Sequence, residues 1–375
     1  MQRFPVARPC LSELEERYAL DAVRSGWISS QGPYLRRFEE EFARQCGAAT
    51  AVATANGTVA LHLALAAAGI GPGDEVIVPA LTYVATANAV TYCGSRPVFV
   101  DVVPETWCLD PEQVRAAITP RTRAVVAVDL YGHPADYRQL AQLCRRHGLL
   151  LVADAAESYG ATSDGEPTGR LADLTTFSFF GNKIITSGEG GCVVTSDEAL
   201  AARMRLLRNQ GMDPQRRYWF PVVGFNYRMT NVAAALLCAQ MERAPEIIAE
   251  RERVVSAYEA QLADVPLLSP QPVSARVRKA PWMASFLVGP PGDATSRDAL
   301  ARALDREGVE TRPFFVPITE LPAYRAGQVD HPVARDLGRR GLNLPTYADL
   351  TDADLKQIVE RIRAAVAIIH APLTR

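Results

Sequence analysis

The first half of the chain alternates short apolar runs with stretches of helical periodicity. The apolar runs predict seven strands, at residues 51–53, 75–78, 96–100, 123–130, 149–153, 175–180 and 191–195. Helical patterns between them include residues 58–68, 111–117 and 136–147. Nearly continuous apolar strands separated by helices predict an α/β fold, with a mainly parallel seven-stranded sheet covered by helices.

The pattern changes in the last third of the chain. A long helix is predicted from about residue 231 to 260, interrupted or kinked near Pro245. Residues 265–280 contain several prolines and are interpreted as a connection. Strands at 285–288 and 309–312, with helices at 296–307 and 352–369, predict a smaller α/β unit. We therefore expect two domains, residues 1–248 and 249–375.

Composition narrows the class of protein. The chain has 375 residues, of which 48% are hydrophobic and 22% charged, and its formal net charge is −2. These values are typical of a globular protein and give no reason to expect nucleic acid or an anionic membrane as a partner. The N-terminus lacks the apolar core of a signal peptide, and residues 51–70 are too polar to span a bilayer. We expect a cytoplasmic protein.

The cysteines and histidines do not indicate a metal site. The seven cysteines are scattered without a Cys-x-x-Cys pair, and the five histidines have no metal-like spacing. Reduced thiols and no bound metal are therefore expected. The chain also lacks Gly-x-Gly-x-x-Gly and Gly-x-Ser-x-Gly, so a Rossmann dinucleotide site and a triad hydrolase are poor fits.

Lysine is rare in this chain. Only three of the 40 Lys and Arg residues are lysine, namely Lys183, Lys279 and Lys356. A lysine amine can lose its proton and attack a carbonyl to form a Schiff base, which arginine cannot do. Lys279 is interpreted as a solvated loop charge and Lys356 as part of the polar face of the last helix. Lys183 lies among apolar residues and glycines, so it is the first candidate for a catalytic amine.

Two groups suited to a phosphate follow predicted strands. Gly57 and Thr58 open a helix, and the backbone N–H groups of a helix N-terminus bind anions. The alternative is a plain helix cap formed by Asn56 or Thr58. Ser178, five residues before Lys183, can place its hydroxyl on the same phosphate; the alternative is a serine in a tight turn.

Two further groups suit a flat heterocycle at the carboxyl ends of the strands, where ligands of α/β sheets bind. Asp154 ends an apolar strand, and a carboxylate there would keep a pyridine nitrogen protonated; the alternative is a helix-capping aspartate. Tyr83 can lie on the face of a ring, although a lone aromatic is more often core packing. Together with the phosphate seat and Lys183, these residues predict a site for pyridoxal 5′-phosphate (PLP).

Three segments resemble a known family. They are residues 152–158 (Val-Ala-Asp-Ala-Ala-Glu-Ser), 178–191 (Ser-Phe-Phe-Gly-Asn-Lys-Ile-Ile-Thr-Ser-Gly-Glu-Gly-Gly) and 224–231 (Gly-Phe-Asn-Tyr-Arg-Met-Thr-Asn). They resemble motifs of the DegT/DnrJ/EryC1/StrS aminotransferases, and the resemblance covers nearly the whole chain. It implies the PLP-dependent transferase fold of type I, that of aspartate aminotransferase. It also implies transfer of an amino group from L-glutamate to a nucleotide-linked keto sugar.

The resemblance implies roles for the cofactor-binding residues. Lys183 would bind PLP covalently and carry the proton transfers, Asp154 would face the pyridine nitrogen, and Tyr83 would stack on the ring. The phosphate would be held by Gly57, Thr58 and Ser178. Glu157 matches the position near the phenolic oxygen of the cofactor.

The resemblance also implies a second subunit and a substrate site. Asn226 resembles a residue that reaches the phosphate of the neighbouring subunit's cofactor, which implies a homodimer with shared active sites. The sugar nucleotide is expected to be bordered by Trp27 and Ser29 in the loop 27–32, by Arg228 and by Arg312.

Within the family, residues 26–32, 209–214 and 217–219 most resemble the members that convert GDP-4-keto-6-deoxymannose into a 4-amino sugar. Many members have Gln at the position of Glu157, and a second carboxylate near the phenolic oxygen predicts an altered titration of the bound cofactor. Phe220 stands where a histidine is common, which leaves the sugar open. Members that remove hydroxyl groups have His in place of Lys183, so this chain is not expected among them.

Other functions remain open from the sequence. The acceptor can be another nucleotide-linked keto sugar, such as a 3-keto sugar or one linked to dTDP or UDP, for an antibiotic or a polysaccharide. A non-catalytic PLP-binding regulator would bind PLP without turning over amino donors. A PLP lyase or desulfurase would need a mobile catalytic cysteine, whereas Cys192 is interpreted as part of a strand core. A plain sugar-nucleotide binding protein would lack the visible chromophore.

Overall fold

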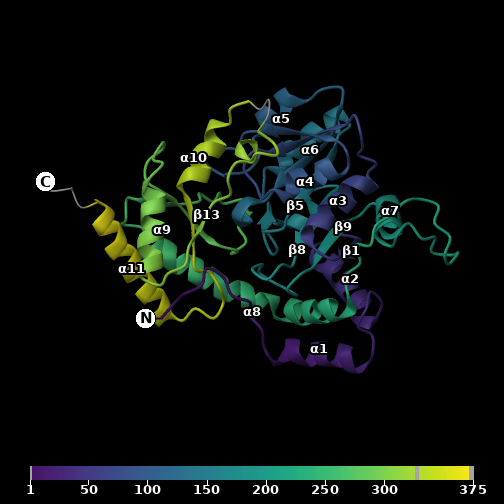
Figure 1. Cartoon of the computed structure of the whole chain (residues 1–375), viewed down its shortest axis with the longest axis horizontal. Coiled ribbons are helices and arrows are strands. Elements are labelled where there is room, and N and C mark those ends of the chain that lie inside the picture. Colours follow the sequence, from purple (N-terminus) through teal and green to yellow (C-terminus); the bar gives the residue numbers. More distant parts are fainter. Residues whose placement is uncertain (1, 326–328, 371–375) are drawn as a thin grey trace.

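A computed structural model describes residues 2–325 and 329–370 (Figure 1). Its largest sheet has seven strands in the order β1-β9-β8-β5-β4-β2-β3. The strands are β1 (Thr50–Thr54), β2 (Glu75–Pro79), β3 (Arg96–Val100), β4 (Thr122–Val128), β5 (Leu150–Asp154), β8 (Leu174–Ser178) and β9 (Gly191–Thr195). The five strands from β8 to β3 run parallel, while β9 is antiparallel to both of its neighbours. The mainly parallel α/β sheet expected from the sequence is thereby confirmed.

Helices pack against this sheet. They include α2 (Pro33–Gln45), α3 (Gly57–Ala67), α4 (Ala85–Tyr92), α5 (Pro111–Ala117), α6 (Tyr137–His147) and α7 (Glu198–Arg208). Helix α3 is apolar nearly all round because it packs against β8 and β9 as well as α4 and α7. Its N-terminus therefore has a fixed position at the carboxyl ends of the strands.

Helix α8 (Asn231–Gln261) connects the large sheet to the C-terminal part of the chain, and α1 (Glu13–Arg24) and α2 pack along it (Figure 1). The helix continues through Pro245, so the predicted interruption was wrong, while the alternative of a kink at this proline stays a prediction. Packing along its length stabilises the helix despite the backbone hydrogen bond that the proline cannot donate. The domain boundary that we proposed at residue 248 falls within this helix.

The C-terminal unit is built on a second sheet, β10-β12-β14-β13, whose neighbouring strands are antiparallel. Its strands are β10 (Leu268–Pro270), β12 (Ala284–Val288), β13 (Arg312–Pro313) and β14 (Gly341–Leu344), and its helices α9 (Ser296–Arg306), α10 (Pro332–Arg340) and α11 (Asp352–His370). Its apolar core also takes in Phe4 from the N-terminus. None of the helices in the described ranges is long and apolar enough to cross a membrane.

Residues 265–280 are more than the connection that the prolines suggested. They contain β10, which joins the second sheet, and β11 (Val277–Arg278). Strand β11 pairs with β6 (Thr162–Ser163), which also pairs with β7 (Glu166–Pro167) in a small sheet. Strand β10 has three residues and β11 has two, so both are too short to give a periodic pattern in the sequence.

Candidate active site

A cavity of about 690 Å³ lies between the carboxyl ends of the large sheet and the C-terminal unit. Strands β5 and β8 and the N-terminus of α3 supply one wall. Residues of the C-terminal unit, in β13 and β14 and just before β12, supply the other. Eight of the residues expected from the sequence line it, namely Gly57, Thr58, Tyr83, Asp154, Glu157, Ser178, Lys183 and Arg312.

Lys183 lies in the loop between β8 and β9, and its side chain is only 14% exposed. Its Nζ lies 4.0 Å from Oε1 of Glu157 and 4.2 Å from the centre of the Trp282 ring. Burial lowers the pKa of Lys183, against the attraction of Glu157 and Asp154. A lysine with a lowered pKa is suited to accept and return a proton near neutral pH.

Asp154 and Glu157 are both buried beside this amine. Asp154 ends strand β5 and accepts hydrogen bonds from the Thr86 hydroxyl (2.8 Å) and the Ala156 N–H (3.2 Å). Burial raises the pKa of Asp154, because these neutral donors offset only part of the cost of a buried charge. Burial also raises the pKa of Glu157, against the attraction of Lys183 and a hydrogen bond from the Tyr131 N–H.

Gly57, Thr58 and Ser178 come together at the N-terminus of α3. Asn56 caps the helix by accepting from the Val59 N–H at 3.0 Å, while Gly57 and Thr58 lie in the first turn, where amides lack partners within the helix. A Cβ on Gly57 would lie 2.8 Å from Cβ of Ser178, so only glycine allows this approach. The three residues form a cradle suited to a phosphate.

Tyr83 and Arg312 lie on the open side of the cavity. Tyr83 is 56% exposed, and its ring centre lies 5.6 Å from that of Phe315. Arg312 belongs to β13 and is also exposed. An exposed ring and an exposed guanidinium on the rim are available to a ligand that enters from solvent.

The other four predicted residues, Trp27, Ser29, Asn226 and Arg228, do not belong to the lining of this cavity. The carbonyls of Trp27 and Ser29 accept hydrogen bonds from Asn231 at the start of α8, through its side chain (2.7 Å) and its backbone N–H (2.6 Å). Arg228 donates to the side chain of Asn226 at 2.9 Å. One chain therefore brings together the cofactor-binding set and Arg312, but not these four residues.

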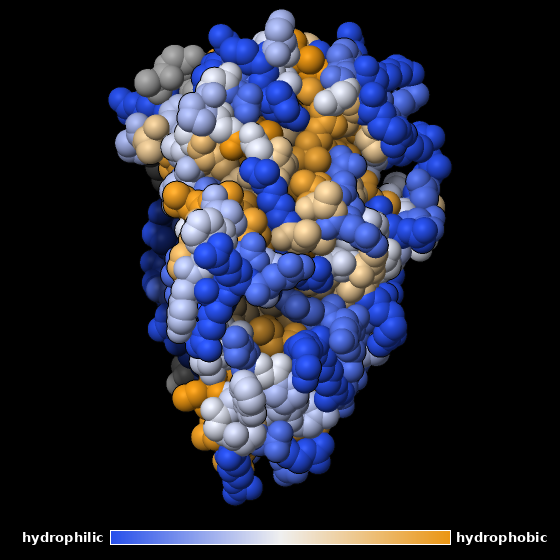
Figure 2. All heavy atoms as spheres, turned by 90° about the vertical axis from the view of Figure 1, so that its right-hand side faces the viewer, coloured by the Kyte–Doolittle hydropathy of each residue, from blue (hydrophilic) through white to orange (hydrophobic). Residues whose placement is uncertain are grey.

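Several exposed apolar residues lie in the same segments as Trp27 and Asn226. Trp27, Ile28, Trp219, Phe220 and Val223 are each about half exposed or more. They come from the segment before α2 and from the loop between α7 and α8. The face of the molecule that carries α7 and this loop shows apolar areas between polar ones (Figure 2).

Residues that sequence reasoning missed come mostly from the second unit and from the turn after β4. Trp282, just before β12, covers Lys183, and Tyr131 donates its N–H to Glu157 at 2.7 Å. Thr86, on α4, holds Asp154. The only local signal was that Thr86 follows the predicted Tyr83 by three residues, which places both near the start of one helix.

Lys279 corrects one expectation. It was interpreted as a solvated loop charge, but it is only partly exposed. Burial lowers its pKa to about 8, against the attraction of Glu259. Nothing in the local pattern Val-Arg-Lys-Ala-Pro showed that β11 pairs with β6 just before this lysine, or that the lysine is partly buried. Lys356 is exposed on α11, as expected.

The cavity fits PLP in charge, shape and hydrogen bonding. Asp154 is a buried carboxylate whose hydrogen-bond donors are neutral, so a protonated pyridine nitrogen would supply a charged donor. The cradle at Gly57 and Ser178 leaves room for a phosphate. In addition, Oδ1 of Asn182 is buried in the lining and has no hydrogen-bond partner within the described part of the chain, so it can accept from a ligand.

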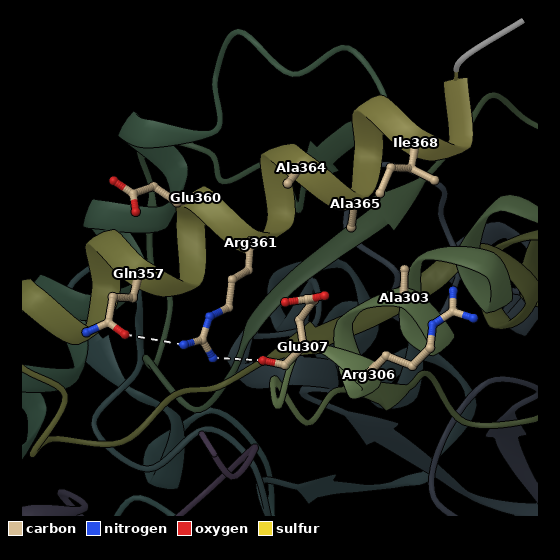
Figure 3. A pocket seen from close by; sticks show the side chains of 9 residues that line it. All are labelled: Ala303, Arg306, Glu307, Gln357, Glu360, Arg361, Ala364, Ala365 and Ile368. Carbon is tan, nitrogen blue, oxygen red and sulfur yellow. Dashed lines mark hydrogen bonds between the residues drawn. The ribbon is translucent and has the colours of Figure 1, made fainter. Parts of the chain in front are cut away.

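A second pocket, of about 410 Å³, lies between α9 and α11 (Figure 3). Arg361 crosses it and donates to the carbonyls of Glu307 (2.8 Å) and Gln2 (3.1 Å) and to the side chain of Gln357 (3.3 Å). None of the residues expected to act in the site lines this pocket. Arg361 connects the N-terminus to the C-terminal unit through these hydrogen bonds, which is a structural role.

Comparison with known proteins agrees with this geometry. A model of the DegT/DnrJ/EryC1/StrS aminotransferase family matches residues 9–363. A GDP-perosamine synthase of Caulobacter vibrioides is 51% identical over 361 residues, which cover 96% of this chain and 97% of that protein. A GDP-perosamine synthase of Escherichia coli O157:H7 is 42% identical, over 96% of this chain and 98% of that protein.

The fold comparison gives the same result. Spr1654 of Streptococcus pneumoniae, solved in its PLP form, superimposes with a TM-score of 0.93. The two chains are 26% identical, and the match covers 99% of this chain and 100% of Spr1654. The expected type I fold of PLP-dependent transferases is thereby confirmed.

Proposed function

The chain belongs to the DegT/DnrJ/EryC1/StrS aminotransferase family, and on this premise we propose that it moves the amino group of L-glutamate to a GDP-linked keto sugar. It is a PLP-dependent sugar aminotransferase. The observation that carries the chemistry is one cavity that holds the Lys183 amine, the Asp154 carboxylate and the phosphate cradle of Gly57. The acceptor that we propose is GDP-4-keto-6-deoxymannose, because the two GDP-perosamine synthases match nearly the whole chain.

Each residue of the cavity has a distinct task in this proposal. When bound, PLP supplies a carbonyl that takes up the donor's amino group and a ring that withdraws electrons from the carbon beside it. Asp154 keeps the ring nitrogen protonated, and the cradle of Gly57, Thr58 and Ser178 fixes the phosphate. Lys183 would hold the cofactor through its amine, and the freed amine would then take a proton from the donor's α-carbon and return it to the cofactor.

The second half of the reaction uses the same amine in the opposite direction. Once water has released the donor's carbon skeleton as 2-oxoglutarate and the keto sugar has entered, Lys183 would take the proton back from the cofactor and deliver it to the sugar carbon that receives nitrogen. Because one group must accept and deliver protons, its pKa has to lie closer to neutrality than that of a free lysine. The lowered pKa of Lys183 supports this role.

We further propose that the working unit is a homodimer in which each site borrows residues from the other chain. Trp27, Ser29, Asn226 and Arg228 lie outside the cavity of their own chain. Exposed apolar side chains on the same segments, such as Val223 at 91%, suit burial against a second copy. Arg228 and Asn226 would then face the partner's cofactor and sugar nucleotide.

A mixed-subunit experiment tests the shared site. The variants Lys183→Arg and Asn226→Asp are each expected to have little activity, since every site in either homodimer carries one defect. Mixed dimers should regain activity, because one of their two sites contains no substitution. Mixtures that stay as inactive as the separate variants would contradict sharing, and light scattering on the same samples gives the oligomeric state.

The acceptor is tested with isotope-labelled donor. The enzyme is incubated with L-[¹⁵N]glutamate and GDP-4-keto-6-deoxymannose, and mass spectrometry should find a GDP-linked amino sugar that carries ¹⁵N. Faster turnover of a dTDP- or UDP-linked keto sugar would replace the proposed nucleotide. A protein that acquires PLP absorbance but does not respond to glutamate would use another amino donor or act as a regulator. A protein that stays colourless with PLP would overturn the cofactor assignment.

A further inference from the structure

Trp282 contacts the loop between β8 and β9, which carries Lys183, in two ways. The face of its indole ring lies 4.2 Å from Nζ of Lys183, within the range of a cation–π interaction. Its indole N–H donates to the carbonyl of Asn182, the residue before the lysine, at 2.9 Å. One side chain of the second unit thus binds both the amine and the backbone that carries it.

Trp282 also connects Lys183 to Glu157. Its ring is nearly parallel to that of Tyr131, with centres 6.0 Å apart and planes inclined by 10°. Tyr131 in turn donates its backbone N–H to Oε2 of Glu157, whose Oε1 faces Lys183 at 4.0 Å. The lysine amine therefore lies between an aromatic face and a carboxylate that the neighbouring aromatic residue holds.

The backbone of Trp282 is held by a buried cation. Arg251, on α8, is 1% exposed and donates to the carbonyls of Trp282 (3.1 Å) and Thr346 (3.2 Å). Trp282 itself is only 4% exposed. Because Trp282 is held at its backbone, its ring and its indole N–H, its side chain has little freedom to move, and it offers the lysine amine a fixed aromatic face.

We propose that Trp282 is a positioning residue that holds the free amine of Lys183 over its indole ring between the two halves of the reaction. An aromatic face attracts the ammonium form, so Trp282 stabilises the state that Lys183 reaches once it has taken up the proton and before it delivers that proton to the sugar carbon. The other charged groups facing this amine are Glu157 and Asp154, which favour the ammonium, and Arg312, which opposes it. Glu189 lies farther out on the exposed rim.

The test measures the amine itself instead of turnover. The full-length enzyme is loaded with pyridoxamine 5′-phosphate, so that Lys183 is free, and is labelled briefly with acetic anhydride at a series of pH values. Mass spectrometry of peptides gives the pH midpoint of labelling for Lys183. Lys356, exposed on α11, is an internal control whose midpoint should be the same in all variants.

Two substitutions separate electrostatics from packing. Trp282→Met fills much of the space without an aromatic face, and we expect the Lys183 midpoint to fall by about 0.5 to 1.5 pH units. Trp282→Phe keeps a ring face, so its midpoint should stay close to the wild-type value. A Met variant that titrates at or above wild type, or a Phe variant that shifts as far as Met, would overturn the proposal. If the Met variant does not fold, Trp282→Leu replaces it.

The inference rests on the proposed role of Lys183, but the two can fail separately. Labelling is repeated on the cofactor-free protein, where the midpoint depends only on the groups around the amine. A shift in the Met variant together with no response of the PLP absorbance to glutamate would retain the role of Trp282 and reject the proposed reaction. An unshifted Lys183 midpoint in the Met variant, together with full transamination by the wild type, would reject the role of Trp282 and retain the proposed reaction.

Discussion

Oε1 of Glu157 lies 4.0 Å from Nζ of Lys183 in a site where the exposed fractions of the two side chains are only 6% and 14%. Burial raises the pKa of the carboxyl and lowers the pKa of the amine, while their mutual attraction acts in the opposite direction on each. The two pKa values therefore move toward each other, and a proton on either partner changes the charge that the other experiences.

This relationship predicts a pH effect of Glu157→Gln. The substitution removes a negative charge beside the cofactor, and a lost negative charge lowers the pKa of any proton-binding group nearby. We expect the pH titration of the bound cofactor's visible absorbance to move down by about one pH unit. Glu112→Gln, on the exposed surface of α5, is the control. An unchanged titration would show that Glu157 is already protonated throughout the pH range.

Lys183→Arg is expected to lower transamination by about 100- to 10,000-fold, even though the positive charge is kept. A guanidinium neither releases its proton near neutral pH nor forms the covalent link to the cofactor. The rate of 2-oxoglutarate formation measures the effect. Lys356→Arg, the same change on the exposed face of α11, should leave the rate unchanged. Substantial turnover by Lys183→Arg would reject the central assignment.

Gly57→Ala should weaken PLP binding by about tenfold or more. The added Cβ would lie 2.8 Å from Cβ of Ser178, so one of the two elements must move and the phosphate cradle narrows. Fluorescence titration of the cofactor-free protein gives the Kd. Gly71→Ala is the matched control, since no atom lies within 4 Å of its Cβ position. Equal affinity in both variants would show that the phosphate does not use this cradle.

Glu75→Gln tests stability at acid pH. Burial opposes ionisation of Glu75, but hydrogen bonds from Thr119, Arg96 and Arg121 outweigh it and lower its pKa to about 2. Because the folded pKa is below the unfolded value, ionised Glu75 stabilises the fold above pH 4.5, and this contribution is lost as the pH falls toward 2. We expect the free energy of unfolding to drop by about 2 kcal/mol at pH 7, a value reduced for the exposure of both arginines.

Urea unfolding at several pH values measures this effect. The difference between wild type and Glu75→Gln should shrink as the pH falls from 4.5 toward 2. Glu112→Gln, which removes an exposed ion pair with Arg115, is expected to change the unfolding free energy by less than about 0.5 kcal/mol. A constant difference across this pH range would mean that packing, and not ionisation, explains the effect.

The sequence predicted the cofactor-binding half of the site because that half is local. Lys183 and Ser178 belong to one strand and its following loop, and Asp154 and Gly57 lie directly at the junction of a strand and the next element. Parallel strands bring their carboxyl ends to one edge, so residues at these junctions meet in space whatever the details of packing. Periodicity likewise located the strands of the large sheet to within a few residues.

Other features needed the tertiary structure. Trp282 reaches Lys183 across about one hundred residues of chain, and Arg251 fixes it from the middle of α8. The partial burial of Lys279 depends on two-residue strands that no periodicity reveals. That α8 continues through Pro245 depends on the helices packed along it.

The sequence by itself determined the cofactor-binding groups at the ends of the strands, because residues at the junctions of parallel strands meet at one edge of the sheet. Only the tertiary structure decided how the charges around Lys183 are balanced. The pKa of an amine depends on burial and on partners a few ångströms away, and Glu157, Trp282 and Arg312 reach it from three separate parts of the chain.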